Sequence, residues 1–147
     1  MKTYYAIENL VVDGNLELSN TKIQTLPEGL EVKGWLNLRN TPIRSLPEGL
    51  KVGGGLNLSN TPIQALPENL TVGEWIILNN TSIQALPENL TVGGGLYLSS
   101  TPIQVIPESL KVGDYIYLSN TKLSDSQEEL NHKVQKLQNG EYCRLAK

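Results

Sequence analysis

The chain has 147 residues, a formal net charge of −3 at pH 7 and 39% apolar residues, with two Trp, six Tyr and no Phe. This length is about that of one domain, and the scarcity of aromatic residues means that a core must be built from Leu, Ile and Val. The 15 acidic residues outnumber the 12 basic ones, which argues against nucleic acid or an anionic membrane as partner, because both attract clustered Lys and Arg. A single Cys (Cys143) excludes an intramolecular disulfide, and a single His (His132) excludes most catalytic metal sites.

The N-terminal segment predicts neither export by a signal peptide nor membrane insertion. It carries one basic residue but reaches Glu8 before any long apolar run, unlike a secretory signal. No later stretch approaches the ~18 consecutive apolar residues of a transmembrane helix. We therefore expect a cytoplasmic protein, and signal-independent export to a host stays open. Residues 1–9, which contain Tyr4, Tyr5 and Ile7, are expected to cover the N-terminal end of the fold as an edge strand.

From Leu10 onward the sequence repeats itself every twenty residues without an insertion. A fixed period of this kind is typical of a solenoid, in which each unit has too little apolar surface to fold alone and neighbouring units share one core. We expect six coils over residues 10–124. The recurring columns begin at Leu10, Val12, Leu16, Leu18, Thr21 and Ile23.

Each repeat contains the signals for one strand and two turns. Leu56 and Leu58 are separated by one residue, the spacing at which a strand places side chains on the same face. Parallel stacking of such pairs predicts one sheet along the solenoid. The Gly53-Gly54-Gly55 segment is expected to make a tight turn with positive φ. The chain must also turn at Pro67, because Pro cannot continue a central sheet ladder. These turns are expected on the convex side.

The pattern Leu56-x-Leu58-x-x-Thr61-x-Ile63 resembles the LxLxxNxL centre of the leucine-rich repeat. The twenty-residue period and the Leu-Pro corner resemble the short bacterial class of secreted effectors, and also repeat proteins of phages and mobile elements. The resemblance covers residues 10–129. It implies a concave sheet face open to partners, a Thr that hydrogen-bonds the neighbouring coil where the family has Asn, and a Val column that takes the inward volume of the family's first Leu.

The repeat stops after Thr121, and a different pattern follows. Ser124 and Gln127 form a candidate capping box, and Leu130, Val134 and Leu137 follow at the spacing of one apolar helix stripe. We expect residues 125–147 to form a capping helix, over about 125–139, and a partly loose tail. The helix is expected to cover the open edge of the last strand.

The residues that flank the inward Leu pair of each coil are expected on the exposed, concave face of the sheet. In one column large rings alternate with Gly, so that a ring can lie over the bare backbone of the next strand. Exposed Trp and Tyr are typical of binding hot spots, although aromatic residues also simply favour strands. The candidate partner-binding residues are Trp35, Asn37, Arg39, Trp75, Ile77, Tyr97, Tyr115 and Tyr117.

Other conspicuous residues have structural explanations. The Glu that follows each Pro suits a short turn better than a cation site, and the repeated Asn suits turns and hydrogen bonds between coils. His132 and Cys143 have no companion base in the sequence, so we predict no catalytic, cofactor or metal site and no enzyme activity. The repeated Glu residues are Glu28, Glu48, Glu68, Glu88 and Glu108, and the repeated Asn residues are Asn20, Asn40, Asn60, Asn80 and Asn120.

The sequence therefore favours non-catalytic recognition of another protein through the aromatic face. The family resemblance implies a more specific form, a phage- or pathogen-encoded inhibitor or effector that blocks an enzyme of a host's defence. Two alternatives stay open. One is carbohydrate binding, for which Trp and Tyr platforms also serve, and the other is a homodimer with the aromatic face as its interface.

Overall fold

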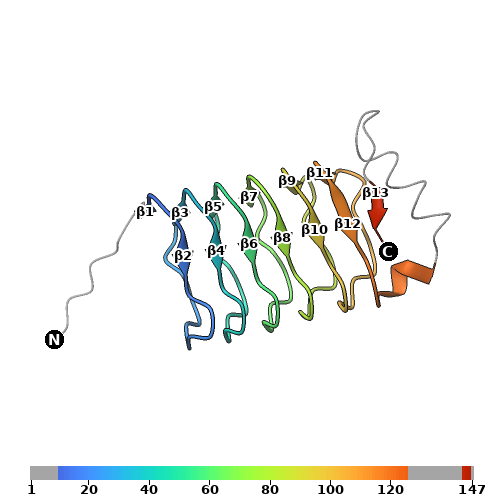
Figure 1. Ribbon diagram of the computed structural model, residues 1–147, viewed down its shortest axis with the longest axis horizontal. Helices are drawn as coiled ribbons and strands as arrows, with labels where there is room; N and C mark the ends of the chain where they lie inside the picture. Colours follow the sequence, from blue (N-terminus) through green and yellow to red (C-terminus); the bar gives the residue numbers. More distant parts are fainter. Residues whose placement is uncertain (1–9, 126–143, 147) are drawn as a thin grey trace.

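A computed structural model describes residues 10–125 and 144–146, which wind into a parallel β-solenoid of six coils (Figure 1). Each coil contributes two short strands. The first strands of the coils are β1 (Val11–Val12), β3 (Glu31–Val32), β5 (Lys51–Val52), β7 (Thr71–Val72), β9 (Thr91–Val92) and β11 (Lys111–Val112). The second strands are β2 (Leu16–Glu17), β4 (Leu36–Asn37), β6 (Leu56–Asn57), β8 (Ile76–Ile77), β10 (Leu96–Tyr97) and β12 (Tyr115–Tyr117).

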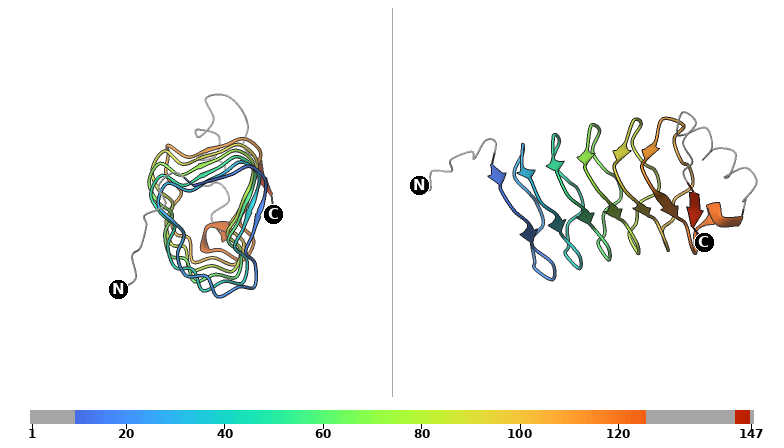
Figure 2. Two further views of the ribbon diagram at one scale, coloured as in Figure 1. Left: turned by 90° about the vertical axis from the view of Figure 1, so that its left-hand side faces the viewer. Right: turned by 45° about the horizontal axis from the view of Figure 1, so that its top comes forward.

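The strands form two parallel sheets, so the prediction of a single sheet is wrong. The first strands make sheet A and the second strands make sheet B, because a bend at residues 33–34 and its equivalents breaks each extended run in two. Both sheets keep the twenty-residue register, with Val32 opposite Val52 and Leu36 opposite Leu56. Seen along the solenoid axis, the coils superpose as closed rungs (Figure 2).

The glycines between the two sheets are explained by close packing. Within the described residues, positive φ among glycines occurs at Gly29 and Gly49, so the prediction of positive φ at Gly53–Gly55 is wrong. A Cβ on Gly73 would collide with the carbonyl oxygen of Gly53 one coil earlier. Bare backbone at this position lets successive coils approach and hydrogen-bond, as where the amide of Gly73 donates to the Val52 carbonyl at 2.9 Å.

The core consists of stacked aliphatic columns without an aromatic ring among the described residues. Leu56 and Leu58 are fully buried, and Val52 is 1% exposed, which confirms the inward Leu pair and the inward Val column. At about 25 cal/mol per Å² of apolar surface removed from water, these columns are the dominant stabilising contribution. No single coil can make them alone.

The turn after sheet B is held by the repeated Asn and Thr. Asn20 and its equivalents have positive φ, near 60°, and Asn60 Nδ2 donates to Asn40 Oδ1 at 2.9 Å, so the prediction of turns and inter-coil bonds is confirmed. Thr61 is 3% exposed, and its Oγ1 donates to the Leu58 carbonyl of its own coil at 2.7 Å. We expected Thr61 to hydrogen-bond the neighbouring coil, but its short side chain instead closes the turn of its own coil.

The two ends differ from the sequence expectations where they can be described. Lys122–Asp125 forms the 3-10 turn η1, and the rest of the predicted helix 125–139 lies outside the described residues, as does the predicted strand within 1–9. The segment assigned to a tail supplies β13 (Arg144–Ala146), which pairs parallel with β12, Leu145 opposite Ile116. Across the ranges 10–125 and 144–146, no helix has the length and apolar character to cross a membrane.

Candidate functional site

The outer face of sheet B carries all eight candidate partner-binding residues. Strand alternation places them there: in β8, Ile76 is fully buried in the core and Ile77 is half-buried on the outside. The register lines up Asn57, Ile77, Tyr97 and Tyr117 in one row across β6, β8, β10 and β12. Arg39 is exposed and the other seven are half-buried. We call Trp75, Ile77, Tyr97, Tyr115 and Tyr117 the aromatic patch.

Trp75 lies over Gly55 on the neighbouring coil. Three indole carbons, Cδ2, Cε2 and Cζ2, are nearly equally close to the position that a Cβ of Gly55 would occupy. The glycine therefore lies against the face of the ring and not against its edge. The prediction that a ring covers a neighbouring glycine is therefore confirmed at this pair. The opposite face of the indole is turned away from Gly55, and Trp75 is half-buried.

The three tyrosines of the patch form a cluster. The rings of Tyr97 and Tyr117 stack with centroids 4.4 Å apart and planes 5° apart, and Tyr115 meets Tyr117 at 6.1 Å and 51°. Tyr97 also covers Gly95 of its own coil, where an added Cβ would lie 3.2 Å from its ring. At Gly95 the covering ring thus comes from the same coil, in contrast to Gly55.

The cluster changes the acidity of Tyr117. Burial among its neighbours raises the pKa of the Tyr117 hydroxyl above its ordinary value, and the proximity of Tyr97 and the charge of Asp114 raise this pKa further. Burial and negative charge both disfavour the phenolate. The Tyr117 hydroxyl therefore stays protonated to a higher pH than an ordinary tyrosine.

Trp35, Asn37 and Arg39 lie apart from the patch, on coil 2, in a half of the face that is polar apart from the Trp35 ring and that we call the polar half. Coil 3, with Gly55 and Asn57 at the corresponding positions, separates them from the aromatic rows. Asn37 Nδ2 donates to Glu17 Oε2 at 3.0 Å, and the Arg39 amide donates to Asn37 Oδ1 at 3.1 Å. Hydrogen bonds from the hydroxyl and the amide of Ser19 lower the pKa of Glu17. This half is a satisfied hydrogen-bonded surface.

Sequence reasoning missed three charged residues around the patch. Glu74 and Asp114 occupy a column that holds Gly in the other coils, and both are exposed. Their departure from the repeat was the available signal. Strand β13 places Arg144 in register with Tyr115 at the far edge, and the lack of any repeat pattern in that segment gave no signal.

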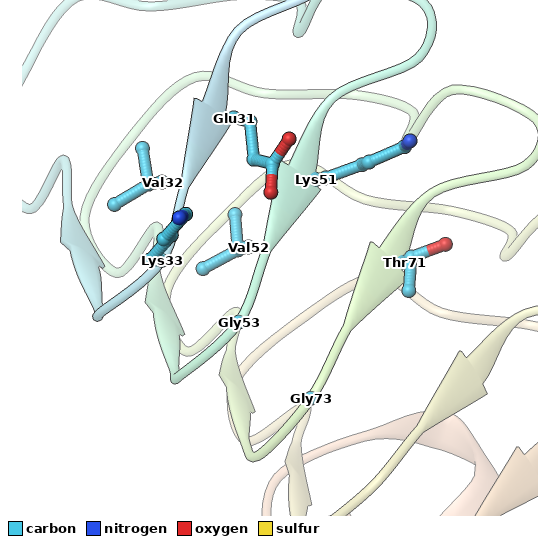
Figure 3. Close-up of a pocket in the computed structure, with 8 residues that line it drawn as sticks. All are labelled: Glu31, Val32, Lys33, Lys51, Val52, Gly53, Thr71 and Gly73. Atoms are coloured by element: carbon cyan, nitrogen blue, oxygen red, sulfur yellow. The ribbon is translucent and has the colours of Figure 1, made fainter. Parts of the chain in front are cut away.

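The other described surfaces offer less chemistry. A shallow hollow over sheet A has Glu31, Lys51 and Thr71 extending from one side of the strands, and Val32 and Val52 from the other (Figure 3). Within residues 10–125 and 144–146, no group of three His, Cys, Asp or Glu side chains is placed to hold a metal ion. His132 and Cys143 lie outside the described residues.

Comparison with models of protein families, with curated proteins and with solved structures found no match to this chain. The stacked coils and their two parallel sheets establish the β-solenoid, and the geometry of the sheet B face is the observation on which a function can be proposed.

Proposed function

We propose that the protein is a non-catalytic binding module that recognises another protein through the aromatic patch. The observation that supports this most directly is the gathering of Trp75, Ile77 and three tyrosines on one side of coils 4–6, where each is half-buried on the outer face of sheet B. Tyr and Trp are enriched at interface hot spots because each offers a large apolar area together with a polar group.

The arrangement of the rings favours tight binding. Tyr97 and Tyr117 hold one another by stacking, and Trp75 rests on the backbone of Gly55. Side chains that are already ordered lose less conformational entropy when a partner covers them. The repeat supplies a rigid support, because each strand beneath the patch is hydrogen-bonded in the sheet.

A capture experiment with matched variants tests this function. Wild-type protein, the double variant Trp75→Ala/Tyr117→Ala and the control Val105→Ala are immobilised and exposed to the same cell lysate. Val105 is an exposed apolar residue, 56% accessible, outside both sheets. We expect a protein that wild type and the control retain and the double variant loses. Identical sets of retained proteins on all three would refute the proposal.

The more specific role rests on the resemblance to leucine-rich repeats. The inward Leu-x-Leu columns of this solenoid agree with that resemblance, and the short effector and phage classes are its nearest form in repeat length. We propose on this basis an inhibitor or effector that acts in the cytoplasm, either of the cell that makes it or of a host, by covering a defence enzyme. Identifying the protein captured above tests this role.

Carbohydrate binding is the second candidate, and one observation favours it. The indole of Trp75 lies flat on Gly55, the orientation of a platform on which a sugar ring stacks. A glycan array that shows saturable, Trp75-dependent binding would support it, and an array without hits would exclude it for the glycans present. A homodimer that buries the patch would appear in light scattering at micromolar concentration as twice the monomer mass.

A further inference from the structure

We propose that the partner presents a basic segment to the aromatic patch, with an arginine side chain placed against its rings. This inference rests on the proposed function and adds the chemistry of the partner. Three observations support it: the charges around the patch, the arrangement of the rings, and the contrast with the polar half of the same face.

The only charged residues in the patch rows are acidic. In coils 4–6 the patch rows comprise residues 74–79, 94–99 and 114–119, which run from the bend through the second strand to the first residue of the turn that follows it. These residues include Glu74 and Asp114 but neither Lys nor Arg. Both carboxylates belong to exposed residues. The backbone of Arg144 lies one strand further, in β13, in register with Tyr115. An acidic partner segment would be repelled here.

Trp75 presents an electron-rich ring face to an incoming group. Tyr97 and Tyr117 cover one face of each other by stacking. The indole of Trp75 has one face against Gly55 and the opposite face turned away from that glycine. The negative quadrupole of such faces attracts a cation within about 6 Å of the ring centre.

Arginine fits this setting better than lysine. A guanidinium group is planar, stacks on aromatic rings, and is more weakly hydrated than an ammonium group, so less solvation is lost on half-buried rings. Its remaining N–H groups can meet a carboxylate such as that of Glu74 at the rim. The polar half of the face also has a ring, that of Trp35, but it is a poorer match, because its exposed Arg39 would repel a guanidinium group and the Glu17 carboxylate already accepts a hydrogen bond from Asn37.

Selection from a random twelve-residue display library tests the inference. Wild-type protein is the target, and the Trp75→Ala/Tyr117→Ala variant removes peptides that do not depend on the patch. We expect the surviving peptides to be net positive and enriched in Arg. For the strongest peptide, replacement of its Arg by Gln should weaken binding at least tenfold. The variant Glu74→Gln/Asp114→Asn should weaken it several-fold at low salt, and the control Glu68→Gln, an exposed acid on another side of the coil, should not.

The outcomes separate this inference from the function on which it rests. Patch-dependent peptides that are neutral or acidic, or that bind equally well without their Arg, would overturn the basic-partner inference and leave the binding function standing. A selection that yields no patch-dependent peptide would count against both. An equal loss of affinity in Glu68→Gln and in Glu74→Gln/Asp114→Asn would show general charge attraction in place of a rim contact.

Discussion

The indole of Trp75 lies flat on the backbone of Gly55, one coil away. The contact joins a residue of the proposed binding surface to a position where the repeat has no side chain. It explains the glycine at position 55, because a Cβ there would take the space that the ring occupies.

Replacing Gly55 by Ala should displace Trp75 without unfolding the protein. The added Cβ would overlap the ring, but an outward-facing side chain can rotate away, so we expect a loss of less than about 1 kcal/mol in unfolding free energy. Tryptophan fluorescence in a Trp35→Phe background, which leaves Trp75 as the reporter, should shift to longer wavelength. An unchanged spectrum would contradict the flat contact.

Replacing Gly73 by Ala should be much more costly, because the obstacle is backbone. The added Cβ would collide with the carbonyl oxygen of Gly53, and the two coils would have to separate. We expect a loss of about 1–3 kcal/mol or more in urea denaturation. The control is Gly14→Ala, since a Cβ at Gly14 would meet no atom within 4 Å. Equal stability of the two variants would be incompatible with this packing.

Replacing Thr61 by Val should show the contribution of the buried hydroxyl. The substitution keeps the shape but leaves the Leu58 carbonyl without the bond that Thr61 Oγ1 donates at 2.7 Å. A buried acceptor that loses its donor costs about 1–3 kcal/mol. The matched control is Thr21→Val, which removes the same bond, to the Leu18 carbonyl, at an exposed position. A thermal melt should show a clearly smaller effect there.

The raised pKa of Tyr117 predicts a loss of stability in alkali. Folded protein holds this proton more tightly than unfolded protein, so the contribution is fully present below the ordinary tyrosine pKa of about 10 and is lost as pH rises through the higher folded value. The ultraviolet absorbance of tyrosinate should report one late titration, which moves down in Tyr97→Phe. Titration of all tyrosines together near pH 10 would refute the raised pKa.

Much of the fold could be predicted because the repeat constrains each residue six times over. The inward Leu56 and Leu58, the inward Val52 and the turn at Asn60 all follow from columns that recur in every coil. The division into two sheets could not be predicted, because the same bend occurs at Asp13, at Lys33 and at Gly53, so no residue type marks it in every coil.

The sequence predicted which residues of the candidate site point outward, but not how their side chains are arranged relative to one another. Alternation places Ile77 and Tyr97 outside, whereas the stacking of Tyr97 on Tyr117 depends on rotamers that no spacing specifies. The pairing of Arg144 with Tyr115 was also beyond reach, since a segment without a repeat has no register of its own.

The most direct test of the binding function is the dissociation constant of the captured protein, measured by titration calorimetry against wild type, Tyr117→Ala and Val105→Ala. A hot-spot tyrosine contributes about 2 kcal/mol or more, so Tyr117→Ala should weaken binding by roughly thirtyfold, while Val105→Ala should bind like wild type. Equal affinity of wild type and Tyr117→Ala would show that the partner binds elsewhere on the solenoid.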